Sequence, residues 1–217
     1  MDYVGRLKRV NGHEVTFELD ERPDIEELSR FSNNDTIKAE VTFDDNRRLS
    51  ADQRKKAWAL LSDIARHTGF TPIDAGDWMK AYFMAETGID YFSLSDCSVT
   101  TARLFISYLI DFCFEWNVPF KGKGLDLHDD IRKYLWLCIK HRKCALCGLK
   151  GEIHHMNAIG AGRDRTTIDH SNHDLICLCR RHHSEAHNIG RQTFEDKHKV
   201  QGIKLTLEDV KRFRIGG

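Results

Sequence analysis

Apolar and polar residues alternate with a period of two in the first part of the chain. In residues 13–19 (HEVTFEL) every second side chain is apolar, and the Asn11-Gly12 pair just before them favours a tight turn. Residues 36–43 (TIKAEVTF) repeat the alternation. Because neighbouring side chains of a strand point to opposite faces, these segments predict a β-hairpin and a small antiparallel sheet.

The apolar spacing then changes to that of helices. Ser50 and Gln53 form a capping-box pattern, and apolar residues recur at helical spacing over residues 57–65. Three further helices are predicted, over residues 77–86, 99–116 and 129–141. The second of these three is apolar nearly all round, which indicates a buried core helix.

A loop rich in glycine and lysine, residues 121–127 (KGKGLDL), precedes the last of these helices. It predicts a domain boundary, with one domain over residues 1–125 and a second over residues 126–217. The fold class expected is α+β, with a small antiparallel sheet and helices in the first domain. No internal repeat is visible.

Composition is that of an ordinary globular protein, with 41% hydrophobic and 30% charged residues and 3 prolines among 217 residues. The N-terminus lacks the apolar core of a secretory signal. The longest apolar run, residues 104–116, is too short to span a bilayer. A cytoplasmic location without membrane contact is therefore expected, where the seven cysteines would be thiols or metal ligands.

Charge is unevenly distributed although the formal net charge is +0. Residues 132–217 contain 17 Lys and Arg against 9 Asp and Glu, a balance of +8, and 9 of the 12 histidines. The remainder of the chain is correspondingly acidic. A basic, histidine-rich part is suited to a polyanionic partner, although a solvated basic surface would have the same composition.

Two short motifs predict a closed zinc site. The Cys144-x-x-Cys147 spacing lets one tight turn direct both sulfurs at one ion, and Cys179-x-x-His182 supplies a second pair. Together they predict a structural Cys3His zinc site. The remaining cysteines are expected to be buried as small apolar side chains: Cys97, Cys113, Cys138 and Cys177.

Four nearby histidines predict a second, open metal site. His183 and His187 are four residues apart, so on a helix they share a face and can bind one ion. His182 lies about 100° around that helix from His183 and can turn to the zinc. His154 and His155 are neighbours on a predicted strand, so one can bind metal while the other faces a substrate. A three-histidine site beside a free base is expected.

The segments CALC, IHH and LICLCRRHHSEAH, within residues 144–187, resemble the HNH nuclease family. This resemblance implies a zinc-stabilised ββα-metal domain within residues 126–217. It implies that His154, His183 and His187 bind a catalytic divalent ion (Mg²⁺, Mn²⁺, Ni²⁺ or Zn²⁺). It also implies that His155 is the general base.

One position departs from the family pattern. The family's central Asn, which orients the base, corresponds to Asp174, the residue before Leu175. A carboxylate can also orient an imidazole by accepting its N–H, so Asp174 is predicted to do so, with Asn172 as the alternative. The glycine-containing loop of residues 158–165 carries Arg163 and Arg165, which are predicted to contact DNA phosphates.

The chain also resembles proteins of bacteriophage origin. Its C-terminal block is similar to HNH proteins of phage and prophage recombination modules. Residues 47–70 and the region of Trp78 resemble, more weakly, the NinB (Orf) recombination-mediator family, which binds single-stranded and branched DNA; a purely structural scaffold is the alternative for this part.

The function expected is that of a metal-dependent HNH DNA endonuclease of a phage or prophage recombination or replication module. Its expected partners are DNA, including single-stranded or branched forms, and recombination or replication proteins. The alternative is a non-catalytic zinc module that binds such DNA as a recombination mediator. That alternative requires only the Cys3His site, whereas cleavage requires the three-histidine site as well.

Overall fold

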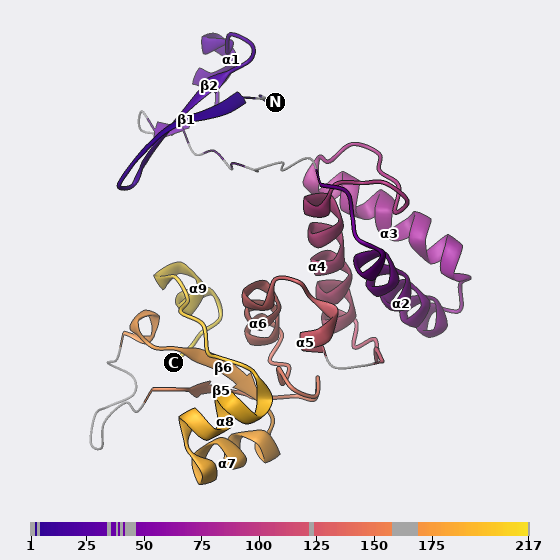
Figure 1. The fold of residues 1–217 in the computed structure, drawn as a ribbon, viewed down its shortest axis with the longest axis vertical. Coiled ribbons are helices and arrows are strands. Elements are labelled where there is room, and N and C mark those ends of the chain that lie inside the picture. The colour runs from indigo at the N-terminus through magenta and orange to yellow at the C-terminus, as the bar shows by residue number, and fades with distance from the viewer. Residues whose placement is uncertain are drawn as a thin grey trace. The chain divides into compact units, whose positions relative to one another are not determined.

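The computed structural model describes residues 3, 5–33, 36–37, 39, 41, 47–121, 124–157 and 169–216. The chain forms two compact units, Met1–Phe43 and Asp44–Gly217 (Figure 1). The boundary predicted after residue 125 lies inside the second unit, so separate folding on its two sides stays a prediction. Small antiparallel sheets and helices occur together, as the α+β prediction requires.

The first unit contains the predicted hairpin. Strands β1 (Gly5–Asn11) and β2 (Glu14–Leu19) pair antiparallel, with Asn11 opposite Glu14. The two turn residues are Gly12 and His13, and Gly12 has a φ of 58°, which glycine adopts without strain. The unit also contains α1 (Ile25–Ser29) and a second short hairpin of β3 (Ser32–Asn33) and β4 (Thr36–Ile37).

Little apolar surface is removed from water in this unit. Among its described residues none is buried, and Val10 in β1 is 61% exposed. A hairpin on its own is marginally stable in water. The strand predicted over residues 36–43 is seen only as β4, because residues 38, 40 and 42–43 lie outside the described part of the chain.

Three helices form the first half of the second unit: α2 (Ala51–Thr68), α3 (Pro72–Thr87) and α4 (Val99–Glu115). The predicted capping box is present, since the Ser50 hydroxyl accepts from the Gln53 amide and the Gln53 side chain accepts from the Ser50 amide. The second helix starts five residues before the predicted Asp77. Thr71 caps it, and Pro72 at its first position needs no hydrogen-bond acceptor.

Helix α4 is the core helix, as its apolar pattern predicts. Phe105, Leu109 and Ile110 are completely buried in it, and α2 and α3 pack beside it (Figure 1). Two short helices follow, α5 (Gly124–Leu127), where a loop was predicted, and α6 (Ile131–Lys140), which packs on α4. Helix α6 leads directly to the first cysteine pair.

The C-terminal part contains a two-stranded sheet and three helices. Strands β5 (Glu152–His155) and β6 (Leu175–Leu178) pair antiparallel, with His154 opposite Ile176. Helix α7 (Arg180–Ile189) follows β6 directly and packs against both strands (Figure 1). The remaining elements are a short 3₁₀ helix (His170–Asn172), α8 (Arg191–His198) and α9 (Leu207–Arg212). No helix in the described ranges is long and apolar enough to cross a membrane.

Candidate metal centres and active site

A tight turn between α6 and β5 holds the first cysteine pair. The Cys144 amide donates to the Leu149 carbonyl at 2.7 Å, and the Gly148 amide donates to the Cys144 carbonyl at 2.8 Å. Gly148 has a φ of 70°, a conformation that side chains disfavour. The turn therefore directs Cys144 and Cys147 to the same side.

The second pair comes from the start of α7, where Cys179 precedes the helix and His182 lies in its first turn. Nδ1 of His182 lies 3.3 Å from Sγ of Cys144 and 3.4 Å from Sγ of Cys179, and the sulfurs of Cys147 and Cys179 are 3.7 Å apart. Zn–S bonds of about 2.3 Å and Zn–N bonds of about 2.0 Å in a tetrahedron require edges of about 3.8 Å between sulfurs and about 3.5 Å from sulfur to nitrogen. The four donors fit a structural zinc ion.

Local electrostatics also favour metal binding. Burial raises the pKa of Cys179, but hydrogen bonds with the His182 amide, the Cys147 and Cys144 side chains and the Arg181 amide together lower it below its ordinary value. Thiolates are the ligand form of cysteine. Burial lowers the pKa of His182, which keeps its ring in the neutral form that binds metal.

The other cysteines are accounted for by packing. Cys177 lies in β6 and is completely buried, as a strand packed on both faces requires. Three other cysteines, in or next to helices α4 and α6, are also buried and belong to neither ligand cluster: Cys97, Cys113 and Cys138.

A second cluster joins β5 to α7. One ligand nitrogen from each of His154, His183 and His187 lies within 4.8 Å of the others. The Nε2 atoms of His183 and His187 are 3.1 Å apart, as their spacing of four residues on a helix predicts. Two nitrogens bound to one zinc-sized ion would be about 3.3 Å apart. The three side chains therefore fit a divalent ion that retains open positions.

Burial and the neighbouring imidazoles of His183 and His187 lower the pKa of His154 to about 4. Its ring is thus neutral near pH 7. The Glu152 carboxylate, also on β5, lies 3.4 Å from Nδ1 of His183. A carboxylate on the outer nitrogen orients an imidazole so that its other nitrogen faces the metal. This position of Glu152 was not anticipated from the sequence.

His155 is on the opposite face of β5, as strand geometry predicts. Its Nε2 lies 2.8 Å from Nδ1 of His170, and its ring centroid is 5.6 Å from that of His173. His170 is buried, with 5% exposure, and the Asp169 carboxylate caps the 3₁₀ turn that carries it. The contact of His155 with His170 was also missed from the sequence, because the two residues belong to different elements.

The two residues considered as orienters of His155 have other partners. The Asp174 carboxylate accepts a hydrogen bond from Arg191 at 3.2 Å, and the Asn172 amide donates to Asp169 at 2.8 Å. The described contacts bring His170 to His155. The predicted phosphate ligands Arg163 and Arg165 lie outside the described residues.

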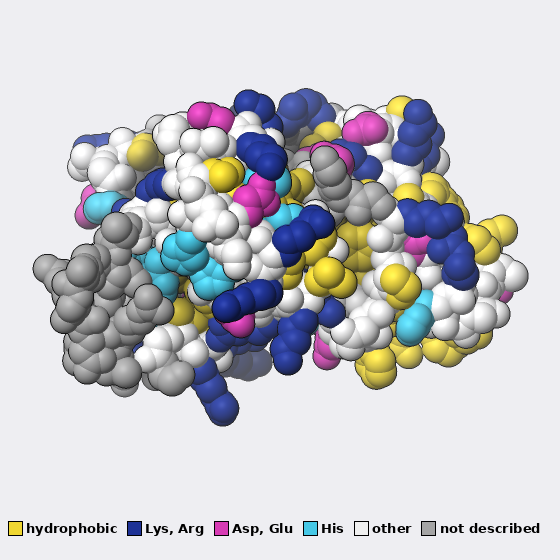
Figure 2. All heavy atoms as spheres, turned by 90° about the horizontal axis from the view of Figure 1, so that it is seen from below, with side chains coloured by type: hydrophobic (Ala, Val, Ile, Leu, Met, Phe, Trp, Pro, Cys, Tyr) yellow, Lys and Arg dark blue, Asp and Glu magenta, His cyan; other side chains and the backbone are white. Residues whose placement is uncertain are grey.

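Basic side chains lie near the histidines on the surface. Figure 2 shows histidine side chains gathered on one face, with lysine and arginine side chains, and some acidic ones, nearby. This distribution agrees with the positive balance of residues 132–217. A phosphate-bearing polymer is attracted to such a face.

Comparison with protein families gives one match, to the family described as "Putative HNHc nuclease", over residues 19–216. No curated protein sequence and no solved structure shows a significant match. The family match covers nearly the whole chain, including both ligand clusters and β5, β6 and α7. The chain therefore belongs to this HNHc nuclease family.

Proposed function

We propose that this protein is a metal-dependent DNA endonuclease in which His154, His183 and His187 hold a divalent cation and His155 is the general base. The observation that carries the proposal is that two neighbouring histidines of β5 have different surroundings. His154 faces the histidines of α7, while its neighbour His155 faces away from them toward His170. Adjacent histidines with opposite surroundings can serve metal binding and proton transfer at the same time.

A second ligand cluster distinguishes cleavage from simple DNA binding. The Cys3His cluster has four protein donors, which would complete a tetrahedron around zinc. The three-histidine cluster leaves coordination positions for water and a phosphate oxygen. A module that only binds DNA has no need of it, which favours the nuclease over the zinc-module alternative.

The reaction proposed is hydrolysis of a phosphodiester bond. His155 takes a proton from a water molecule as the water oxygen forms a bond to phosphorus. The bond from phosphorus to the 3′ oxygen breaks and that oxygen takes up a proton from solvent water, leaving a 5′-phosphate and a 3′-hydroxyl, as the family resemblance implies. A divalent cation in the three-histidine site would stabilise negative charge on the leaving oxygen.

His170 would act as a positioning residue for the base. Its Nδ1 lies 2.8 Å from Nε2 of His155, within hydrogen-bond distance. A buried partner with fixed orientation restricts rotation of the imidazole. The role first considered for Asp174 remains an alternative that variants of both residues can test.

The substrate proposed is DNA, with phosphate contacts from Arg163 and Arg165. The positive balance of residues 132–217 supports it. We also propose a setting in a phage or prophage recombination or replication module, with single-stranded or branched DNA bound through the helical half. The resemblances to phage HNH proteins and to the NinB family support this setting.

Incubation of the purified full chain with supercoiled, single-stranded and four-way-junction DNA in Mg²⁺, Mn²⁺ or Ni²⁺ tests the proposal. Cleavage of at least one DNA form, abolished by EDTA and restored by the cation, is expected. The ends should be 5′-phosphate and 3′-hydroxyl. Binding without cleavage of every form, in every metal, would support the non-catalytic zinc module instead.

A further inference from the structure

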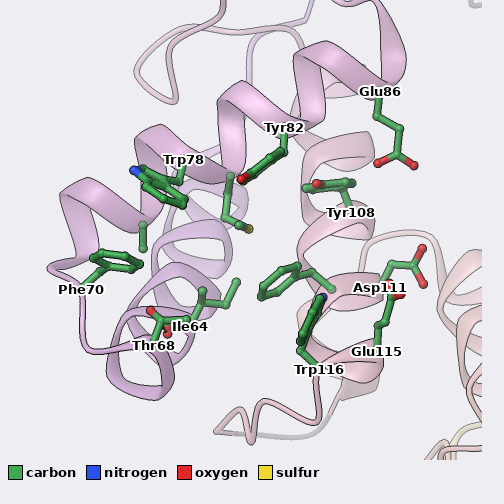
Figure 3. A pocket seen from close by; sticks show the side chains of 13 residues that line it. Ile64, Thr68, Phe70, Trp78, Tyr82, Glu86, Tyr108, Asp111, Glu115 and Trp116 are labelled. Atoms are coloured by element: carbon green, nitrogen blue, oxygen red, sulfur yellow. Dashed lines mark hydrogen bonds between the residues drawn. The ribbon is translucent and has the colours of Figure 1, made fainter.

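A groove lies between α3 and α4. Its lining residues precede both ligand clusters in the sequence and belong to other elements. Its volume is about 570 Å³, within the size range of ligand-binding pockets. Figure 3 shows Trp78 and Tyr82 of α3 on one wall and Tyr108 of α4 with Trp116 on the other. It is called the aromatic groove below.

The aromatic rings of this groove are unusually exposed for their size. Trp78 is 50% exposed, Tyr82 is 53% exposed and Trp116 is 62% exposed. Neighbouring rings hold them in place: the ring centroids of Trp78 and Tyr82 are 6.1 Å apart, and those of Phe112 and Trp116 are 6.0 Å apart. Clustered, pre-oriented rings in water mark a binding surface more often than scattered ones.

The groove is acidic. Three carboxylates line it, those of Glu86, Asp111 and Glu115, and no Lys or Arg is among its described lining residues (Figure 3). Lys140 and His141 pair with Asp111. Glu86 and Glu115 form no ion pair within the described part of the chain, so their charges are available to a ligand.

The Tyr108 hydroxyl is affected by the same negative charges. Burial raises the pKa of its hydroxyl, and the charges of Glu86, Asp111 and Glu115 raise it further. Carboxylates from both α3 and α4 therefore act on the Tyr108 hydroxyl in the groove. A positive group placed there would be attracted both by these charges and by the faces of the aromatic rings.

This combination distinguishes between possible occupants. Bases of single-stranded DNA stack on exposed aromatic rings, but their phosphates need a basic groove, and here the nearby charges are negative. A purely apolar surface would cover Glu86 and Glu115 without neutralising them, which is costly. A segment with both cationic and apolar side chains satisfies the rings and the carboxylates together.

We propose that the aromatic groove binds a segment of a partner protein that presents a Lys or Arg beside apolar side chains. The cation lies near Glu86 and Glu115, and the apolar side chains cover Trp78, Tyr82 and Trp116. The groove thereby recruits the chain to a protein partner. None of the groove's residues belongs to the proposed catalytic machinery, and DNA bound through the helical half would contact surfaces of it outside the groove.

Selection from a displayed library of random dodecapeptides on the purified full chain tests this proposal. Enriched peptides are expected to contain Lys or Arg next to apolar residues. Their affinity, followed by tryptophan fluorescence, should fall at least about tenfold in Trp78→Ala and in the double variant Glu86→Gln/Glu115→Gln, the size of effect typical of central interface residues. The matched control Glu208→Gln, in α9, should bind as the parent does.

Three results would overturn the proposal. They are failure to enrich any peptide, enrichment of peptides without basic residues, and unchanged affinity in the glutamine double variant, whose side chains keep their size and lose only charge. Displacement of the peptides by oligo(dT) would assign the groove to nucleic acid. Self-association of the parent that is lost in Trp78→Ala, measured by sedimentation, would assign it to a second copy of the chain.

Discussion

The contact of 2.8 Å between Nε2 of His155 and Nδ1 of His170 joins the proposed general base to a buried side chain. An asparagine amide at position 170 would reach about the place of Nδ1, whereas leucine fills similar space without a polar atom. His170→Leu should lower kcat by about 10- to 100-fold, a typical effect of removing an outer partner of a site residue. His170→Asn should retain most of the activity.

Steady-state cleavage kinetics and bound-metal content measure this difference. KM and metal content should be the same in both variants, because His170 belongs to neither ligand cluster. A fully active His170→Leu protein would contradict the positioning role. Equal losses in both variants, with intact metal content, would also contradict it.

Metal ligands and their orienting partners differ in how far they are predictable from sequence. His183 and His187 belong to one helix, and His154 and His155 to one strand, so local periodicity assigned their faces. The pairing of His155 with His170 depends on the path of the chain between β5 and the 3₁₀ turn. Nothing in residue spacing specifies that path.

At the scale of elements, His128 links α4 to the start of α6. Its Nε2 is 2.7 Å from the Ser107 hydroxyl, and its Nδ1 accepts from the Asp130 amide at 2.8 Å. Burial lowers the pKa of His128 to about 4 from its ordinary 6.5. The unfolded chain therefore binds a proton that the folded chain excludes as the pH falls below 6.5.

This linkage predicts a pH dependence of stability. The contribution is fully present above about pH 6.5 and is lost progressively toward pH 4, by about 3 kcal/mol in total. In His128→Asn, whose side-chain oxygen can still accept from the Asp130 amide, the loss between pH 7 and pH 4.5 should be smaller by about 2 kcal/mol. Urea unfolding at several pH values measures it, and equal losses in parent and variant would refute the assignment.

The Cys3His cluster connects α7 to the tight turn between α6 and β5 that holds Cys144 and Cys147. Cys144→Ser should lose the tightly bound zinc and unfold the C-terminal part, because short elements around such a site bury too little apolar surface to fold alone. Cys177→Ala, at an equally buried cysteine outside the cluster, should keep its zinc. Elemental analysis by mass spectrometry compares the two variants.

Limited proteolysis of Cys144→Ser also tests the predicted domain boundary. Protection of α2, α3 and α4 with digestion of the C-terminal part is expected if the boundary near residue 125 separates independent folding units. Digestion of α2, α3 and α4 together with the C-terminal part would contradict that boundary. Unchanged zinc content would contradict the ligand set itself.

Helices were predictable to the extent that their signals are local. Ser50 with Gln53, and Ser98, mark helix starts within a few residues of sequence, and the structure confirms both. The start of α3 was placed too late because its first turn, Pro72–Ala75, has little apolar periodicity, although Thr71 caps it. The separation of Met1–Phe43 from the rest of the chain depends on long-range packing, which the alternation of the first strands does not encode.

At the scale of the whole molecule, the two parts of the chain carry opposite charge, since residues 132–217 are basic and the remainder is acidic. The basic balance of residues 132–217 predicts that DNA affinity decreases steeply with salt. Arg163→Ala should weaken binding and reduce the slope of log K against log salt by about 1, the effect of one lost phosphate contact. Fluorescence anisotropy over a salt series measures the slope.

Arg9→Ala, at an exposed position of β1, removes one positive charge from the acidic part and is the matched control. Its slope should equal that of the parent protein. A slope unaltered in Arg163→Ala would show that the loop of residues 158–165 is a connection without phosphate contact. Equal reductions in both variants would point to a general charge effect and not to a specific contact.

The central claim is that His155 transfers a proton in a cleavage reaction while its neighbour binds metal. The most direct test compares the cleavage rate of supercoiled DNA by the parent, His155→Ala and His13→Ala, a histidine in the β1–β2 turn outside both clusters. His155→Ala should retain both metals and DNA affinity and lose about 10²- to 10⁴-fold in rate, the usual contribution of a general base, while His13→Ala should cut as the parent does. Cleavage by His155→Ala at the parent rate would contradict the account.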